Sequence, residues 1–279
     1  MSLEKIPYLT KEIIAGLIKP RVADSHKGTY GHSLLIAGNK GRMGAAVLSA
    51  RACLRTGTGL LTVNVPQDER SILQSTIPEA MLLFREDKLP ELDKFSAIGI
   101  GPALGTDDIS IKLLTDVLYQ YKKNILLDAD ALTILSQRAE LWNPLQEGTI
   151  LTPHVKEFDR LFGESENKTE RINKAIDISK KYPWVIVLKD HETLIIENGD
   201  AWISNTGNAG LAKGGSGDIL SGMITALLAQ GYAPFIAAKI GVYLHGVAAD
   251  IAVKEQSLES LLAFDVVEKI GAAFKSLLI

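Results

Sequence analysis

The stretch Asn208-Ala-Gly-Leu-Ala-Lys-Gly-Gly-Ser-Gly-Asp218 decides how the rest of this 279-residue chain is interpreted. Three of its last five residues are glycines, and an uncharged run, Ile219 to Gln230, follows directly. Apolar residues in that run recur at helical spacing, namely Leu220, Met223, Ile224, Leu227 and Leu228. The pattern predicts a glycine loop that opens a buried helix, with Asp218 in the helix cap or first turn.

Such a loop is suited to binding an anion. Glycines let backbone N–H groups approach a ligand closely, and a helix N-terminus carries partial positive charge, so phosphate is the natural ligand. A carboxylate such as Asp218 gains nothing by binding phosphate, but it is well placed to take a proton from a hydroxyl beside that phosphate. The simpler alternative is that Gly217-Asp218 is only a turn and a helix cap. The glycine cluster ahead of an apolar helix favours the functional interpretation.

Composition limits the class of protein. Hydrophobic residues make up 46% of the chain and charged residues 23%, as in ordinary soluble enzymes. The net charge of -3, without a basic patch, argues against nucleic acid as a partner. A single cysteine, Cys53, fits a reducing compartment. The N-terminus has no apolar signal core, and the uncharged run Ile219 to Ala238 is broken by Gly231 and Pro234. We therefore expect a cytoplasmic protein with two buried helices there and no membrane span.

Short apolar strands alternate with helical segments along the whole chain, which predicts βαβ units and a mainly parallel sheet with helices on both faces. The predicted strands are 34–37, 60–65, 97–100, 124–127, 149–152 and 184–188. The predicted helices include 109–121, 155–162, 171–181 and one from about 265. Asn198-Gly199 predicts a hairpin between two further strands. No linker, repeat or change of composition divides the chain, so we expect one domain, residues 1–279.

The residues that follow predicted strands are the candidates for chemistry, because ligands of open α/β sheets lie at the carboxyl ends of the strands. Besides the glycine loop, they are Gly38, Asn39, Gly101 to Gly105, Asp128, Asp130, His154 and Lys189. Each has a structural alternative: the two aspartates can be turn and cap residues, and the histidine can be structural. Lys189 can reach a phosphate or a carboxylate, or extend to water.

Several familiar nucleotide and catalytic signatures are absent. The chain has no P-loop motif and no Gly-x-Ser-x-Gly elbow. Residues 99–105 have the wrong glycine spacing for a dinucleotide fingerprint, and Pro102 would remove a needed N–H. The five histidines show no metal-ligand spacing.

Six motifs together resemble the NAD(P)H-hydrate dehydratases, which have a ribokinase-like three-layer fold. In chain order they are Lys27-Gly-Thr-Tyr-Gly31, Gly44-Ala-Ala-Val47, Gly101-Pro-Ala-Leu-Gly105, Leu127-Asp-Ala-Asp130, Leu151-Thr-Pro-His154 and the 208–218 stretch. The glycine motif alone would indicate only the ribokinase-like superfamily, whereas the full set is more specific and covers nearly the whole chain. We expect the free-standing type, without the additional epimerase domain of some members.

The resemblance implies a repair reaction. The S-form of hydrated NADH or NADPH would be dehydrated to NADH or NADPH, driven by ADP, which gives AMP and phosphate, or by ATP. The family is taken to phosphorylate the ring hydroxyl and then to lose phosphate. Magnesium is implied by this chemistry, although no ligand cluster is visible, and a homotetramer is expected from the family.

The resemblance also assigns roles to residues of this chain. Asp218 would be the base that activates the hydrate hydroxyl and would contact that substrate. The nucleotide would contact Lys189, Asp190, His191, Glu192, Thr193, Gly214, Gly215, Ser216 and Gly217. The hydrate would contact Ala45, Gly105 and His154, although Ala46 aligns as well as Ala45. Asn39 and Glu157 resemble polar positions near the phosphates.

Two other functions remain open at this stage. A small-molecule kinase of the same fold would use the same anion site and aspartate on a vitamin precursor or a sugar, and would release a stable phosphate ester. A non-catalytic nucleotide-binding protein would be expected to have lost Asp218 or a loop glycine, and neither is lost.

Overall fold

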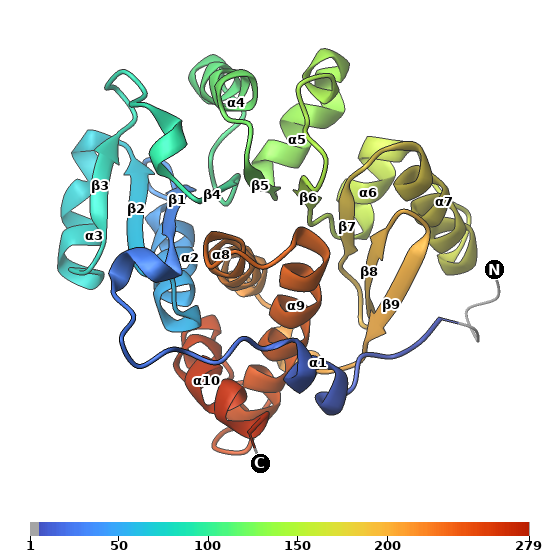
Figure 1. Ribbon diagram of the computed structural model, residues 1–279. Helices are drawn as coiled ribbons and strands as arrows, with labels where there is room; N and C mark the ends of the chain where they lie inside the picture. Colours follow the sequence, from blue (N-terminus) through green and yellow to red (C-terminus); the bar gives the residue numbers. More distant parts are fainter. Residues whose placement is uncertain (1–5, 279) are drawn as a thin grey trace.

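A nine-stranded sheet runs through the computed structural model, which describes residues 6–278 (Figure 1). Its strand order is β3-β2-β1-β4-β5-β6-β7-β8-β9. Neighbouring strands from β3 to β7 are parallel, and β8 is antiparallel to both β7 and β9. The strands are β1 (His32–Ile36), β2 (Leu60–Val65), β3 (Met81–Phe84), β4 (Ala97–Ile100), β5 (Asn124–Leu127), β6 (Ile150–Leu151), β7 (Val185–Leu188), β8 (Thr193–Glu197) and β9 (Asp200–Ser204).

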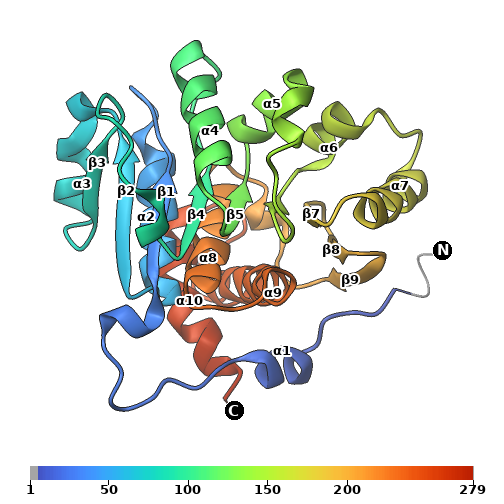
Figure 2. The same ribbon diagram turned by 45° about the horizontal axis from the view of Figure 1, so that its top comes forward.

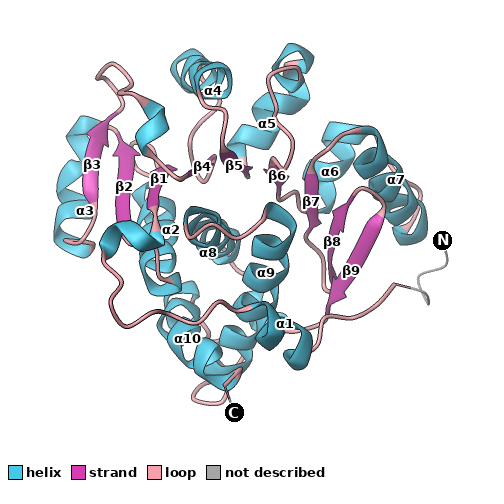
Figure 3. Cartoon of the chain, viewed as in Figure 1, coloured by secondary structure: helices cyan, strands magenta, loops and turns pink. Residues whose placement is uncertain are grey.

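Helices cover both faces of this sheet, as Figures 2 and 3 show. One face carries α4 (Asp108–Gln120), α5 (Asp130–Gln137), α6 (Val155–Phe162) and α7 (Lys168–Lys181). The other carries α2 (Met43–Thr56), α3 (Arg70–Thr76), α8 (Ser216–Ala229), α9 (Pro234–Ala252) and α10 (Ala263–Ser276), with α1 (Lys11–Leu17) packed on α9. The predicted three-layer, mainly parallel arrangement is confirmed.

The predicted elements are largely where the periodicity placed them, although α5 (Asp130–Gln137) was not predicted. The central strand β4 is buried along its whole length, which explains why its sequence is apolar without alternation. The hairpin at Asn198-Gly199 is confirmed, and both residues have positive φ, as its tight turn requires. The strand expected over 149–152 is shorter, and the last helix begins at Ala263.

Two elements at one end of the sheet were not predicted. The helix α3 has seven residues and one buried side chain, Leu73. The edge strand β3 has none, and its Met81 is exposed. Short, partly exposed elements have little hydrophobic periodicity, so these two could not be predicted from pattern.

The uncharged run forms two separate helices, α8 and α9, as expected. Among the described residues, α9 is the one helix long and apolar enough to cross a membrane, but most of it is buried inside the protein. Its sequence is therefore explained by its place in the core.

Helix α8 is packed on three sides without spare room. A Cβ atom on its Gly222 would overlap the backbone carbonyl of Ser49 in α2. A Cβ on Gly99 of β4 would overlap the Thr225 hydroxyl, and one on Gly241 of α9 would come within 2.6 Å of Ile224. Glycine at these three crossings lets α2, β4 and α9 approach α8 closely.

Candidate active site

The N-terminus of α8 lies at the carboxyl ends of the parallel strands, where the sequence placed its candidate residues. Asp128 follows β5, His154 follows β6 and Lys189 follows β7, while Asp218 is in the first turn of α8. His154 and Lys189 are joined by an isolated parallel bridge. A Cβ on Gly217 would be 3.5 Å from the Lys189 ammonium and 3.8 Å from the Asp128 carboxylate. The fold thus gathers residues from four parts of the chain.

Asp128 and Lys189 form a buried ion pair under the glycine loop. Lys189 Nζ donates to Asp128 Oδ1 at 2.8 Å, and Ser221 Oγ donates to Asp128 Oδ2 at 2.6 Å. Asp128 is 1% exposed. Burial alone would raise the pKa of the Asp128 carboxyl, but the Lys189 charge and these hydrogen bonds hold it below its ordinary value. Asp128 therefore positions Lys189, which is neither the turn role nor the ligand role expected for it.

Asp218 lies beside this pair with a free carboxylate. No hydrogen bond to its side chain is found within residues 6–278. Burial, with the nearby Asp128 charge, raises the pKa of Asp218 to about 6, while Lys189 opposes the rise. A carboxylate with a raised pKa and no partner can accept a proton close to neutral pH, as a general base must.

The glycine loop supplies the positive end of the site. Gly215, with φ 96°, is the N-cap of α8, and Ser216 is its first residue. In the described part of the chain, the backbone N–H groups of Gly214, Gly215, Gly217 and Asp218 donate no hydrogen bond. Unpaired amides at a helix N-terminus attract anions, so this geometry suits the anion site that the sequence predicts.

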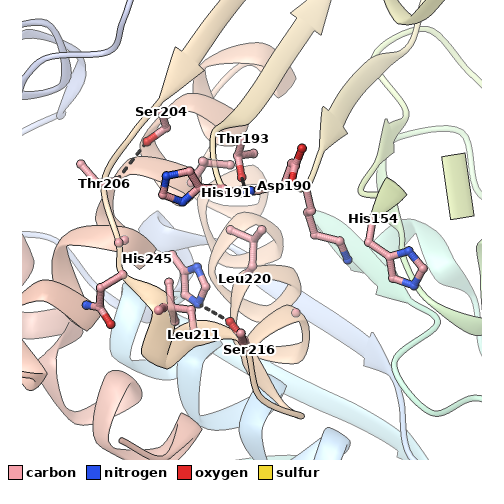
Figure 4. A pocket seen from close by; sticks show the side chains of 18 residues that line it. His154, Asp190, His191, Thr193, Ser204, Thr206, Leu211, Ser216, Leu220 and His245 are labelled. Carbon is pink, nitrogen blue, oxygen red and sulfur yellow. Dashed lines mark hydrogen bonds between the residues drawn. The ribbon is translucent and has the colours of Figure 1, made fainter. Parts of the chain in front are cut away.

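A cavity of about 470 Å³ opens beside this loop (Figure 4). It lies between the strand ends of β7 to β9, the N-terminus of α8 and the middle of α9. Six residues predicted to contact nucleotide line it, namely Lys189, Asp190, His191, Thr193, Ser216 and Gly217. Gly214 and Gly215 are not among its lining residues.

Among the residues predicted to contact the nucleotide, Glu192 directs its side chain to partners outside the cavity. Its carboxylate accepts from Tyr8 Oη at 3.0 Å and from Lys168 Nζ at 2.9 Å, away from the cavity. The ion pair holds the pKa of Glu192 below its ordinary value, with the Lys168 hydrogen bond as the main cause. Any contact of Glu192 with a nucleotide in this cavity would be through its backbone.

The far wall of the cavity was not predicted. Ser204, Thr206, Asn208 and His245 line it. Figure 4 shows Ser204, Thr206 and His245 on the opposite side of the cavity from His154. Asn208 Nδ2 donates to Asp250 Oδ1 at 2.9 Å, so Asp250 of α9 holds the start of the glycine motif in place. The only sequence signal was Asn208 itself, because the other residues are ordinary members of a strand end and an apolar helix.

His245 is buried within α9 and faces the glycine loop. Its Nε2 lies 3.5 Å from Ser216 Oγ. Burial, with the Lys189 charge, lowers the pKa of His245 to about 4, so the ring is neutral at physiological pH. A neutral imidazole can accept or donate one hydrogen bond to Ser216 without adding charge to the cavity.

Of the residues predicted to contact the hydrate, Ala45 in α2 and Gly105 after β4 lie on the β1 and β4 side of the site, whereas His154 follows β6. The Gly105 N–H donates to Asp130 Oδ2 at 2.8 Å, and Asp130 is close enough to raise the pKa of Asp218. A Cβ on Gly105 would be 2.7 Å from Asn39 Nδ2, so these two residues adjoin. Asn39 Nδ2 itself donates to Leu104 O at 3.0 Å.

Two remaining predictions in this region can be refined from burial and capping. In α2, Ala46 is fully buried whereas Ala45 is only partly buried, so Ala45 is the residue available to a ligand. His154 is exposed and caps α6: its Nδ1 accepts from the Glu157 N–H at 3.1 Å, and the His154 N–H donates to Glu157 Oε2. His154 thus has both a structural role and free surface.

Known proteins with a similar sequence and fold identify the family of this chain. The family model for NAD(P)H-hydrate dehydratase matches residues 33–271. The chain belongs to the NAD(P)H-hydrate dehydratase family. An ADP-dependent (S)-NAD(P)H-hydrate dehydratase of Bacillus subtilis is 34% identical over 97% of this chain and 98% of its own.

Other members of the NAD(P)H-hydrate dehydratase family are longer. The bifunctional NAD(P)H-hydrate repair enzyme of Coxiella burnetii is 41% identical over 89% of this chain, which matches 51% of that protein. The chain therefore spans about half the length of the bifunctional relatives it matches.

Solved structures confirm the predicted ribokinase-like fold. The crystal structure of the ADP/ATP-dependent NAD(P)H-hydrate dehydratase of Bacillus subtilis, co-crystallised with ATP and Mg²⁺, has a TM-score of 0.86 at 32% identity. The match covers 98% of this chain and 99% of that one. More distant kinases share the same layers of sheet and helices at 14% identity or less, which shows the fold alone.

Proposed function

We propose that residues 1–279 act as one dehydratase domain that restores NADH or NADPH from its S-hydrate at the expense of ADP or ATP. The observation that carries the proposal is the Asp218 carboxylate: mostly buried, without a hydrogen-bond partner, and adjacent to the unpaired amides of the glycine loop. A base and an anion site next to each other are what transfer of a phosphoryl group to a hydroxyl requires. Membership of the dehydratase family supports this choice of substrate.

The residues would divide the work as follows. Asp218 takes the proton of the ring hydroxyl, whose oxygen then bonds to the terminal phosphorus of the nucleotide. The bond from that phosphorus to the bridging oxygen breaks, so ADP leaves as AMP and ATP leaves as ADP. The Gly214 to Gly217 amides and Lys189 offset the charge that develops on the phosphoryl oxygens. Phosphate then leaves the ring as a neighbouring carbon loses a proton, which restores the double bond.

Magnesium would enter mainly with the nucleotide. Within residues 6–278, no group of three His, Cys, Asp or Glu side chains could hold a metal ion. This fits Mg²⁺, which commonly keeps several waters and is held by substrate phosphates with one or two carboxylates. When bound, the ion would neutralise charge on the phosphates. Asp130 and Glu157, which form no ion pair with a lysine or arginine within residues 6–278, would be the carboxylates available to hold it. We also propose a cytoplasmic location and a homotetramer, on the resemblance to the family.

The test follows the absorbance at 340 nm of purified protein given hydrated NADH, Mg²⁺ and either ADP or ATP. A nucleotide-dependent rise is the expected result, since only reduced nicotinamide absorbs there, and the faster nucleotide is the preferred donor. Repeating the assay with hydrated NADPH ranks the two substrates. No rise from protein that binds nucleotide would overturn the proposal. A screen of small alcohols for nucleotide-dependent phosphorylation would then separate a kinase from a non-catalytic binding protein.

A further inference from the structure

A second and larger cavity lies at the opposite end of α8 from Asp218. Its volume is about 740 Å³, and α8, α2 and α10 line it with their C-terminal ends, together with residues 18–22, which follow α1. The segment after α1 passes beside α10 in Figure 1. Since α8 has 14 residues, the two cavities are separated by about 20 Å along its axis. We call this space the distal cavity; neither the dehydration chemistry nor the predicted site residues involve it.

The charge of the distal cavity is opposite to that of the protein. The chain has a net charge of -3, yet Lys19, Arg21 and Arg55 line this cavity, and none of its described lining residues is Asp or Glu. Arg55 is paired with Glu268 at 2.7 Å, just outside the lining. Lys19 and Arg21 have no ion-pair partner within residues 6–278. The cavity therefore presents two cations that have no carboxylate partner in the described residues.

These two cations are held in place by aromatic rings and carbonyl oxygens. Lys19 Nζ lies 4.7 Å from the centre of the Tyr232 ring and donates to Gly231 O at 2.9 Å. The Arg21 guanidinium lies 3.8 Å from the centre of the Tyr30 ring and donates to Gly57 O. Within residues 6–278 each group has one hydrogen-bond acceptor and further N–H donors without one, because an ammonium has three N–H groups and a guanidinium five. Pre-positioned donors bind an anion at a lower entropic cost than free side chains do.

Most of the remaining lining is apolar or aromatic, and Thr29, Thr56 and Gln230 are its uncharged polar residues. Ile18, Leu227 and Phe274 contribute to it, and a Cβ placed on Gly271 would meet no atom within 4 Å. A purely ionic ligand would leave this apolar surface exposed to water, whereas a ligand with an apolar body would bury it.

We propose that the distal cavity binds a small organic anion, a phosphate or carboxylate attached to an aromatic or apolar body. The anionic group would lie between Lys19 and Arg21, and the body would lie against Leu227 and Phe274. Such binding is independent of the proposed dehydration. It would occupy the C-terminal ends of the two helices, α2 and α8, whose N-terminal ends carry Ala45 and Asp218.

The test uses the fluorescent aromatic sulfonate 8-anilinonaphthalene-1-sulfonate as probe, with excess ADP and Mg²⁺ present to occupy the first cavity. We expect saturable binding of about one dye per chain. Either 1-naphthyl phosphate or 1-naphthoate should displace the dye, and the better competitor identifies the anionic group. Neutral 1-naphthol should compete at least tenfold more weakly, and inorganic phosphate should not compete. Equal competition by 1-naphthol would show an apolar patch without anion selectivity, and dye that binds only when ADP is left out would belong to the nucleotide cavity. Both results overturn the proposal.

Two variants of the cavity make the test specific. Lys19→Met/Arg21→Met should weaken dye binding at least tenfold, while Lys11→Met/Lys254→Met, two exposed lysines outside the cavity, should change it less than twofold. Gly271→Leu should abolish binding with both cations intact, because the new side chain fills the open space. Equal dye affinity in wild type, the cavity double variant and Gly271→Leu would also refute the proposal.

Discussion

Replacing Asp218 by asparagine should stabilise the protein while it removes activity. The pKa of Asp218 is raised from its ordinary 3.8 to about 6, mainly by burial. A carboxyl whose folded-state pKa is raised costs stability wherever it is ionised in both states, which is above about pH 6. At 1.36 kcal/mol per pKa unit, the full cost is about 3 kcal/mol. Because the side chain is partly accessible to water, we expect Asp218→Asn to recover about 2 kcal/mol at pH 8.

The pH dependence distinguishes this explanation from a general effect of the substitution. At pH 4 the carboxyl is protonated in the folded chain and about half ionised in the unfolded chain, whose pKa is the ordinary 3.8, so the gain of Asp218→Asn should fall to about 0.5 kcal/mol or less. Urea unfolding at a series of pH values from 4 to 8 measures both limits. Asp24→Asn, at an exposed aspartate, controls for the loss of one negative charge.

Two results would refute the reasoning. A gain that is the same at pH 4 and pH 8 would mean that the ionised carboxylate is not the source of the cost. A loss of stability at pH 8 would mean that Asp218 makes favourable contacts in the folded protein. Either result would also refute the role of Asp218 as an activated base.

Four further predictions concern the same region. The kcat/KM of dehydration should rise with pH to a plateau, with a midpoint near 6, as Asp218 loses its proton; a profile that is flat from pH 5 to 8 would argue against it. Lys189→Met should lower the free energy of unfolding, measured in urea, by about 3–5 kcal/mol because it leaves buried Asp128 unpaired. Adding Asp128→Asn should restore much of that loss. His154→Ala should lower the free energy of unfolding by about 1 kcal/mol, because α6 loses its N-cap. It should also raise the KM for the hydrate; an unchanged KM would mean that His154 has only a structural role. Gly222→Ala should cost about 1–3 kcal/mol in thermal unfolding through overlap with α2, and an unchanged Tm would contradict the tight crossing.

The sequence predicted the fold where burial is complete and repetitive. The central strands and the helix after the glycine loop are apolar over lengths that only buried elements have, so their order and type followed from pattern alone. The edge strand at Met81 did not, because an edge element packs on fewer neighbours and its sequence is less constrained.

The site was predictable in its parts but not in its contacts. Asp218 and the loop were found from their own residues, and the role of Asp128 was not. Its partners Lys189 and Ser221 are 61 and 93 residues away, and no local pattern encodes which side chains meet across such distances. The wall that contains His245 was missed for a similar reason, since a polar residue in a buried helix is informative only when the facing loop is known.

The glycine crossings of α8 restrict which parts of this protein can change in evolution. The proposed base, Asp218, lies on α8, which cannot shift or gain a methyl group at Gly222 without moving its neighbours. The position of Asp218 should therefore be the same for every substrate. The exposed loop residues Asp190, His191 and Ala209 meet no such restraint. Selection for a different nucleotide donor would therefore act on these surface loops, while the distance between the base and the anion site stays constant.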